Sequence, residues 1–530
     1  MPKSAGKLRR AVELTLVARR THLLRVLREL GVAGSKDATR EGAVRLREGL
    51  EELGTTFVKL GQLLSSRPDL LPDVYLDELG KLVDDVPALP YEPIRQVIDE
   101  EIGLDQFASI DPTPLASASI AQIHSALLAN GRNVVVKVRR PGIEEQVNVD
   151  LQLLRRAADS AERHSGTAQL LQVRALADEL EAHLRDELDF REEANNAELI
   201  ASILEDFREE IVVPEVIRPL VAERVLVLEK LEGVRVSEST VPEERAVELA
   251  HAFFRAYIRQ VTVEGLYHAD PHRGNVVVLE DGRLGLLDFG LLGRLDDDTR
   301  TVLALLLLAI AQNRADDVSD LILELSLTTA ESDTAGFLQQ LRRTLPRYHW
   351  RPLAGIRTGE GLADMQRLCL EHGIALPTTF ALVGKTLSQA EDIARSLDPQ
   401  MDPVQIIRDE GQDVLTREIE RRLEPTQLVA FTFSQLQPLL RMPRRIAQVI
   451  RQIETGSLKI SIAPTELENF EHLLRSTANR VGAAMIIASL LIASALMAPV
   501  SHTVALAGFA CAAALGLYML WRIIRTPGGL

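Results

Sequence analysis

The segment from His268 to Gly290 constrains the fold of this chain more than any other part of the sequence. It reads H-A-D-P-H-R-G-N, then an apolar run, Asp281-Gly282, a second apolar run and D-F-G. Asp-Gly between two apolar runs predicts a β-hairpin with a two-residue turn. Counting outward from that turn pairs residue 277 with 286 and residue 275 with 288. The pattern therefore predicts that Asn275 and Asp288 lie side by side at the open end of the hairpin.

This juxtaposition predicts a metal site. A carboxylate beside an amide oxygen offers two hard oxygen ligands, which suit Mg²⁺ held jointly with substrate phosphates. Asp270 precedes Asn275 by five residues, so H-x-D-x-x-x-x-N, a hairpin and D-F-G follow in order, as they do in kinases. His268 and His272 are interpreted as residues that structure this loop rather than as a metal pair, because Pro271 excludes a helix between them.

A second hairpin is predicted further upstream. Asn130-Gly131 separates two apolar runs, and a two-residue turn pairs 129 with 132 and 124 with 137. Lys137 then lies on a strand, where a kinase places the lysine that binds the α- and β-phosphates. Taken alone, it is better interpreted as an edge-strand charge that deters aggregation. The segment Leu115–Ser119, which enters this hairpin, consists of small residues that allow the backbone to approach a ligand.

A phosphate-binding lysine of this kind needs a glutamate partner on a helix. The helical pattern over about 168–204 offers Glu187, Glu192 and Glu193. Most charges on such a helix are merely solvated, so the assignment depends on the other motifs. The segment from Glu223 to Glu229 predicts a strand that runs into the linker between lobes, where adenine would dock.

Two features of an ordinary protein kinase are missing from the sequence. No G-x-G-x-x-G stands over the phosphates, and no A-P-E follows D-F-G. Asp296–Asp298 predict a helix N-cap that leads directly into an apolar helix, Thr301–Gln312. This leaves little room for a segment that docks a peptide, so the sequence argues against an ordinary Ser/Thr protein kinase.

The C-terminal region contains an uncharged stretch between Arg480 and Arg522. Val481–Val500 and Val504–Trp521 are each about as long as a bilayer-spanning helix requires. They predict a transmembrane hairpin whose flanking arginines place both outer ends in the cytoplasm. The alternative is a buried hairpin of a soluble domain, which two successive uncharged spans disfavour.

The N-terminal region is basic, whereas the whole chain has a net charge of −16. Residues 1–50 hold 12 Lys and Arg against 5 Asp and Glu, a net charge of +7. Leu8–Leu30 predicts a basic amphipathic helix, which either lies on an anionic membrane surface or docks on the protein. The acidic remainder makes nucleic acid a poor partner, and two Cys exclude a disulfide scaffold.

Taken together, these motifs resemble the UbiB family of atypical protein-kinase-like proteins, also called the ADCK or AarF family. The resemblance is carried by K-x-G-Q at Lys59–Gln62, the Ala-rich loop at Ala116-Ser117-Ala118-Ser119, Val136-Lys137-Val138 with Arg140-Pro141-Gly142, E-x-D at Glu187–Asp189, H-x-D-P-H-x-G-N at His268–Asn275, and Asp288-Phe289-Gly290. Two positions depart from the family pattern, Arg273 where a proline is common and Ser117 within the Ala-rich loop.

The resemblance implies roles for individual residues. Lys137 and Glu187 would form the ion pair, with Glu193 as the open alternative, and Asp270 would be the acid of the catalytic loop. Asn275 and Asp288 would bind Mg²⁺. The remaining implied nucleotide-binding residues are Lys59, Gln62, Ala116, Ser117, Ala118, Ser119 and Glu229. Lys59 and Gln62 would guard the pocket and suppress protein phosphorylation.

The resemblance also implies a cellular role. We expect an ATP- and Mg²⁺-dependent atypical kinase or ATPase at the bacterial cytoplasmic membrane that supports ubiquinone biosynthesis through lipid precursors or the biosynthetic enzymes. An ATP-sensing scaffold without catalysis and a small-molecule kinase are the alternatives. The phosphate acceptor and the choice of quinone stay open, as does oligomeric state, with a homodimer one option.

The expected fold class is α+β, a two-lobed protein-kinase-like fold with a helical N-terminal extension, a helix-rich C-lobe and a C-terminal transmembrane hairpin. The expected boundaries are 1–110 for the extension, 111–232 for the N-lobe, 233–400 for the C-lobe, 401–480 for a helical juxtamembrane region and 481–524 for the two membrane helices.

Overall fold

The computed structural model describes the body of the chain and short pieces near both ends. The described residues are 10, 12–13, 16–17, 39–65, 67, 70–82, 86–164, 173–326, 332–350, 358–411, 494, 506–507, 509–511 and 513–515. Two units are distinguished, Met1–Arg421 and Arg422–Leu530.

The predicted membrane hairpin at 481–524 and juxtamembrane region at 401–480 lie largely outside the described residues. The described residues between 506 and 515 are helical and exposed. In the part of the chain that the structure describes, no helix combines the length and the apolar character needed to cross a bilayer. The membrane hairpin therefore stays a prediction.

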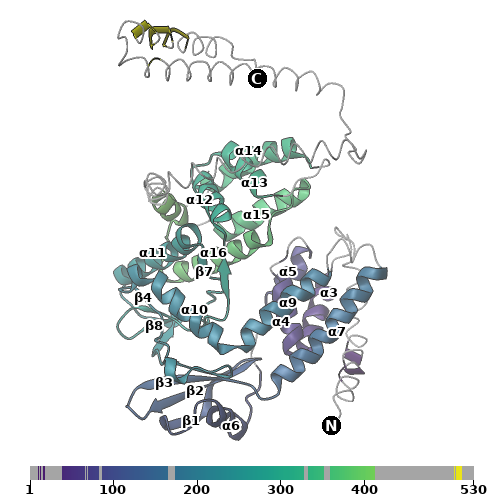
Figure 1. Cartoon of the computed structure of the whole chain (residues 1–530), viewed down its shortest axis with the longest axis vertical. Coiled ribbons are helices and arrows are strands. Elements are labelled where there is room, and N and C mark those ends of the chain that lie inside the picture. Colours follow the sequence, from purple (N-terminus) through teal and green to yellow (C-terminus); the bar gives the residue numbers. More distant parts are fainter. Residues whose placement is uncertain are drawn as a thin grey trace. The chain divides into compact units, whose positions relative to one another are not determined.

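A helical bundle forms the first part of the larger unit (Figure 1). It consists of α3 (Arg40–Leu53), α4 (Thr55–Ser65) and α5 (Asp73–Leu79), together with α7 (Ile143–His164) and α9 (Val173–Leu188). The helices α7 and α9 come after the first strands in the sequence, so two distant segments build this bundle. Its largest apolar cluster comprises Leu46, Leu50, Leu53, Phe57, Leu71, Tyr75, Leu79 and their neighbours.

The N-lobe sheet is antiparallel, in the order β1-β2-β3-β5. Its strands are β1 (Phe107–Ser117), β2 (Ala121–Leu128), β3 (Asn133–Arg139) and β5 (Val225–Glu229). Alternate valines of β3 point to one face, because side chains alternate along a strand. There they meet α6 (Tyr91–Glu101) in a cluster that contains Ile94, Ile98, Val134, Val136 and Val138. The helix α6, which we expected within the extension, thus packs on the N-lobe sheet.

Both predicted hairpins form, but their predicted registers are wrong by one residue. Lys137 lies opposite Ile123 rather than residue 124, and Val277 lies opposite Gly285 rather than residue 286. Each turn holds three residues instead of two, and its last residue is a glycine with positive φ, Gly131 at 87° and Gly282 at 78°. A type I turn followed by a left-handed glycine is the usual geometry of a three-residue loop. The extra residue shifts every pair beyond the turn.

The helix predicted over about 168–204 is also wrong, because it is two helices. The first, α9, ends at Leu188, and α10 (Phe190–Ile203) begins after Asp189. Asp189 has extended backbone angles and its side chain accepts a hydrogen bond from the Arg191 amide, which makes it an N-cap. The break places Glu187 and Glu193 on different helices.

The C-lobe begins with small sheets. One has the order β4-β9-β8-β6, built from β4 (Ile211–Val212), β6 (Gly233–Arg235), β8 (Val276–Leu279) and β9 (Leu284–Leu286). The other pairs β7 (Leu266–His268) with β10 (Leu292–Arg294). The lobe is completed by α11 (Glu243–Arg259), which continues into a π-helical turn (Gln260–Glu264), and by α12 (Asp297–Ala311), α13 (Ala315–Leu325), α14 (Thr334–Trp350), α15 (Thr358–Glu371) and α16 (Thr378–Leu397).

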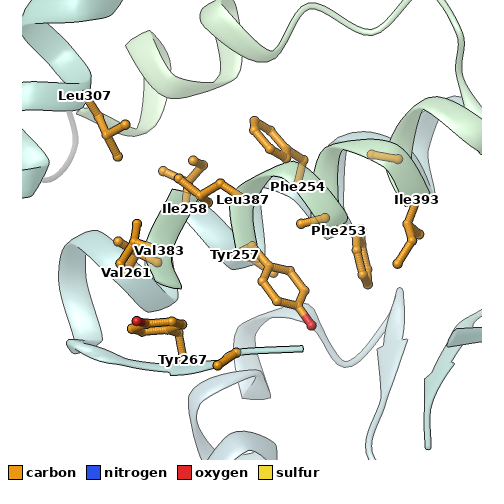
Figure 2. Packing of buried hydrophobic residues seen from close by; sticks show 14 of the residues in the cluster. Phe253, Phe254, Tyr257, Ile258, Val261, Tyr267, Leu307, Val383, Leu387 and Ile393 are labelled. Atoms are coloured by element: carbon orange, nitrogen blue, oxygen red, sulfur yellow. The ribbon is translucent and has the colours of Figure 1, made fainter. Parts of the chain in front are cut away.

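The C-lobe core lies where α11 and α16 meet. Figure 2 shows side chains from the two sides facing one another, among them Ile258 of α11, Val261 of the π-helical turn that follows it, and Val383 and Leu387 of α16. Fully burying each such side chain is worth about 1.5–3 kcal/mol. This packing fixes α16 against the loop that follows β7.

The segment after D-F-G is as short as the sequence predicts. Only β10 separates Gly290 from α12, and Asp296 caps that helix by accepting a hydrogen bond from the Thr299 amide. Helix α12 begins at Asp297, earlier than the predicted Thr301, because the cap lies directly before it.

Candidate functional site

A lysine and two carboxylates form the centre of the candidate site. Lys137 lies on β3, between β2 and β5, and its Nζ lies 2.6 and 2.8 Å from the two carboxylate oxygens of Glu193 on α10. The same Nζ lies 3.4 Å from Oδ1 of Asp288, in the D-F-G segment. We call Lys137, Glu193 and Asp288 the lysine cluster. Its members come from both lobes.

The exposed fraction of the side chain is 7% for Glu193, 17% for Lys137 and 43% for Asp288. The buried part of each side chain by itself disfavours charge. For Lys137 this is outweighed by the negative charges of Asp288 and Glu193, which raise its pKa. The Lys137 charge lowers the pKa of Asp288, which is therefore ionised at neutral pH. Burial raises the pKa of Glu193 to about 7, with Asp288 adding to the effect. Asp288 is thus the firmly anionic member.

The pairing of Lys137 with Glu187 that we expected is wrong. Glu187 lies at the end of α9 and binds Lys59 of α4, with 2.8 Å between Nζ and Oε1, while His183 approaches the same oxygen at 3.3 Å. The helix break at Asp189 is the physical reason. It leaves Glu187 facing the bundle, whereas the first turns of α10 carry Glu193 to β3. The Lys59 charge and the contact with His183 overcome the effect of burial and lower the pKa of Glu187 to about 2.

The Lys59–Glu187 pair joins α4 of the extension to α9. Gln62, one turn after Lys59, donates a 3.4 Å hydrogen bond to the Leu82 carbonyl. The other carboxylate oxygen of Glu187 is buried and has no hydrogen-bond partner among the described residues. The K-x-G-Q segment is therefore held on the bundle, and Lys59 reaches a carboxylate that lies six residues before Glu193 in the sequence.

The catalytic loop, which we define as residues 268–275, is shaped by its first histidine. His268 is buried, its Nε2 donates to the Asp288 carbonyl at 2.5 Å, and its Nδ1 accepts from the Asp270 amide at 3.2 Å. Burial lowers the pKa of His268, which keeps the ring neutral and consistent with this pattern. The ring thereby fixes the backbone at Asp270 and at Asp288 relative to one another.

The second loop histidine has a local role. Nδ1 of His272 accepts a hydrogen bond from the Gly274 amide at 3.0 Å, which tightens the turn before Asn275. Within the described residues, no three acidic, His or Cys side chains gather as a metal site would require. The interpretation of both histidines as residues that structure the loop is confirmed by these contacts.

Asn275 is brought beside the D-F-G segment. The Leu287 amide donates to the Asn275 carbonyl at 2.9 Å, so Asn275 lies opposite the residue before Asp288. Nδ2 of Asn275 is 3.5 Å from the Asp270 carbonyl, and Asn196 of α10 donates to the Phe289 carbonyl at 3.0 Å. An ionised carboxylate and an amide, at adjoining positions, are a donor set that fits Mg²⁺ shared with phosphates.

The small-residue segment is shorter than predicted. Leu115, Ala116 and Ser117 belong to β1, so the turn before β2 is confined to Ala118, Ser119 and Ile120. Arg140 holds this turn by donating to Ser117 Oγ at 3.0 Å and to the Ala118 carbonyl at 3.1 Å.

The helical extension also contacts the small-residue turn. Thr55 of α4 donates to the Ser119 carbonyl at 3.3 Å, and the Val86 amide donates to the Ser117 carbonyl at 3.1 Å. At the other end of the sheet, Glu229 ends β5 as predicted, and its carboxylate accepts from the Glu215 amide at 3.3 Å. The extension therefore lies against the segment where a glycine loop would stand in an ordinary kinase.

The contacts that α16 makes with Asp270 were not predicted from the sequence. Nε2 of Gln389 donates to Asp270 Oδ1 at 3.0 Å, and Nζ of Lys385 lies 3.7 Å from the same oxygen. The only sequence signal for these contacts was that Lys385 and Gln389 are four residues apart and so lie on one helix face. Such a polar pair is usually solvated.

Three family descriptions match this chain. The ABC1 atypical kinase-like domain matches residues 81–322, the UbiB helical domain residues 341–402, and the ABC1/UbiB kinase-like C-terminal domain residues 465–525. The helix α16 and its Lys385 thus lie in the segment similar to the UbiB helical domain.

Relatives match over most of the length. "Probable protein kinase UbiB" of Xanthomonas campestris pv. campestris (strain B100) is 32% identical over 486 residues, which cover 88% of this chain and 86% of the relative. "Uncharacterized protein in hydrogenase 1 5'region" of Clostridium pasteurianum is 28% identical over 91% of this chain and 93% of its own. A solved structure titled "The complex structure of Rv3197-erythromycin from Mycobacterium tuberculosis" is 26% identical, covers 66% of this chain and 94% of that chain, and has a TM-score of 0.43. The chain therefore belongs to the UbiB family of atypical kinase-like proteins.

Proposed function

We propose that this protein binds ATP with Mg²⁺ and turns it over as an atypical kinase or ATPase. The observation that carries the proposal is the lysine cluster. It places a buried cation, held by Glu193, directly beside the ionised Asp288, with Asn275 and Asp270 on the adjoining loop. These are the groups that phosphoryl transfer requires: a lysine that binds phosphates, two oxygen ligands that bind the metal, and an acidic residue near the attacking group.

Mg²⁺ would be held by Asp288 and Asn275, and it would supply charge neutralisation at the bridging phosphate oxygens. Lys137 would bind the α- and β-phosphates, with Glu193 fixing its position. Asp270 would accept the proton of the attacking hydroxyl or water. The turn Ala118–Ile120 would cover the phosphates.

Water or a small alcohol is a better acceptor here than a protein side chain. The segment between Gly290 and α12 is occupied by β10, which pairs with β7. Thr55 and Lys59 also tie the extension to the small-residue turn and to Glu187. Both observations favour ATP hydrolysis or small-molecule transfer over phosphorylation of a docked peptide.

The proposed cellular role is support of ubiquinone biosynthesis at the bacterial cytoplasmic membrane. It rests on the similarity to the Xanthomonas relatives named UbiB and on the uncharged spans between Arg480 and Arg522. ATP turnover would assist the handling of hydrophobic precursors or of the enzymes that act on them.

Phosphate release by the purified full-length protein in anionic liposomes tests the catalytic part. Asp288→Asn should abolish release, and the matched control Asp297→Asn, at an exposed site in the first turn of α12, should keep it. Equal rates for wild type and Asp288→Asn would contradict turnover at this site. ATP binding without release would instead support an ATP-sensing scaffold, and rapid transfer of the phosphoryl group to a soluble alcohol would support a small-molecule kinase.

The cellular part has its own measurements. A deletion strain should accumulate quinone precursors, and wild type should restore the profile whereas Asp288→Asn should not. Removing residues 481–530 should release the protein from membranes. If the shortened protein still pellets with them, the basic N-terminal segment also binds membrane.

A further inference from the structure

Helix α16 supplies a lysine to the catalytic loop. Nζ of Lys385 lies 3.7 Å from Asp270 Oδ1, and Gln389, one turn later, donates to that oxygen at 3.0 Å. The two side chains therefore reach the proposed acid from one face of one helix. The catalytic loop is more than 100 residues away in the sequence.

The position of Lys385 is fixed by its neighbours on α16. Thr386 is buried, and its hydroxyl donates to the carbonyl of Ala269, the residue before Asp270, at 3.0 Å. Val383 and Leu387 are buried against α11 (Figure 2). Lys385 thus stands on a helix that is bonded to the loop and packed into the core, although its side chain keeps 34% exposure.

Lys385 is the cation that faces Asp270. In the described part of the chain, Asp270 is the one carboxylate within 4.0 Å of its ammonium group. Arg273, the arginine of the loop, instead donates to the Asp392 carbonyl at 3.4 Å. Lys137 is engaged by Glu193 and Asp288. The site therefore has two lysines, Lys137 beside Asp288 and Lys385 beside Asp270.

Phosphoryl transfer develops negative charge that this second lysine would stabilise. The acceptor O–H gives its proton to Asp270 and its oxygen bonds to the γ-phosphorus. The bond from that phosphorus to the β–γ bridging oxygen breaks, and its electron pair leaves with ADP. Negative charge spreads over the equatorial oxygens of the γ-phosphoryl group, beside Asp270, and fixed cations stabilise it.

We propose that Lys385 binds the terminal phosphate of ATP, so that α16 completes the catalytic site. The proposal rests on the proposed ATP-dependent function. It assigns a nucleotide contact to the segment similar to the UbiB helical domain. It also makes the site sensitive to the γ-phosphate: ATP gains a contact that ADP cannot make.

Calorimetric titration of the full-length protein in anionic liposomes with MgATP and with MgADP tests this assignment. Lys385→Ala should raise the Kd for MgATP about tenfold while leaving the Kd for MgADP within about twofold, as for loss of a charge-assisted hydrogen bond. Lys385→Arg should restore part of the difference. The charge-matched control Lys81→Ala, on the extension, should change neither affinity.

Equal effects on MgATP and MgADP would overturn the proposal and leave Lys385 as a neutralising partner of Asp270. If Lys385→Ala unfolds, Lys385→Met keeps the apolar stem and allows the same titrations. Failure of the wild-type protein to bind either nucleotide would refute the proposed function itself. Normal wild-type binding with an unchanged ATP preference in the variants would refute only the role of Lys385.

Discussion

At the residue scale, the structure contains two lysine–glutamate pairs where a single pair, Lys137 with Glu187, was expected. Lys137 binds Glu193, and Lys59 binds Glu187. The four side chains are only 7–17% exposed, so removing one partner leaves a charge that partial burial penalises. The two glutamates look alike in the sequence, yet Glu193 pairs with Lys137 of the N-lobe sheet and Glu187 with Lys59 of the extension.

The role of Glu193 leads to a prediction for nucleotide affinity. In Glu193→Gln, Lys137 keeps Asp288 as its only carboxylate partner. Lys137 and Mg²⁺ then compete for the Asp288 carboxylate. We expect the Kd for MgATP to rise about tenfold or more, as for loss of a hydrogen bond to a charged group. Glu192→Gln, at the exposed neighbouring position, is the control. Unchanged MgATP affinity in Glu193→Gln, measured by calorimetry on folded protein, would argue against this role.

Glu187 leads to a prediction for acid stability. Its pKa falls from 4.5 in the unfolded chain to about 2 in the folded protein. A lowered pKa means that the stabilisation is complete above pH 4.5 and is lost as the pH falls toward 2. It is worth roughly 3 kcal/mol at most. The difference in unfolding free energy between wild type and Glu187→Gln, from urea titrations, should therefore shrink between pH 5 and about 3.5. A difference that stays constant with pH would contradict the assignment.

At the element scale, the two hairpins show how a single turn residue decides register. Asn130-Gly131 and Asp281-Gly282 are both good signals for a two-residue turn, yet each glycine occupies the last position of a three-residue loop. The strands themselves were predictable, because short apolar runs rich in valine favour strands whatever the loop length. The pairing across the hairpin was not, since it depends on the backbone angles at one glycine.

Glycine substitutions test this account of the turns. A Cβ at Gly282 meets no atom within 4 Å, so Gly282→Ala costs only the strain of a positive φ, about 1 kcal/mol. Gly282→Asn should cost less, because Asn tolerates that conformation. Gly384→Ala on α16, where the nearest atom is 3.6 Å away, should be neutral or stabilising by about 0.5–1 kcal/mol. Urea unfolding measures all three, and a loss at Gly384 larger than that at Gly282 would refute the argument.

At the scale of the whole molecule, a buried aspartate ties the N-terminal segment to the helical bundle. Nε of Arg10 donates to Asp150 Oδ1 at 2.8 Å, and Thr56 donates to Oδ2 at 3.0 Å. The side chain of Asp150 on α7 is fully buried. Of the two interpretations of the basic N-terminal helix, these contacts favour docking on the protein, although Val12 and Leu16 on it are exposed.

Removing Arg10 should therefore loosen the bundle. In Arg10→Ala, Asp150 becomes a buried carboxylate without a counter-charge, which costs about 3 kcal/mol or more. The control Arg45→Ala removes an arginine whose partner Glu41 is 76% exposed, and it should cost below about 1 kcal/mol. Thermal unfolding and amide exchange of α3, α4 and α7 measure both variants. Equal, small effects of the two changes would show that Asp150 does not depend on Arg10.

The residues of the candidate site could be predicted from local sequence patterns alone. Asp270, Asn275, Asp288 and Lys137 were identifiable because each motif is local, and hairpin and loop signals act over a few residues. The short segment after D-F-G was predictable for the same reason, since Asp296 caps α12 within the same stretch of chain.

Which charges meet depends on tertiary packing. The partner of Lys137 depends on the break at Asp189, and the contacts of Lys385 and Gln389 with Asp270 depend on how α16 packs against α11. Both are set by burial of apolar side chains far apart in the sequence. Non-local packing therefore positions the individual charged side chains at the site. Local sequence patterns cannot predict these positions.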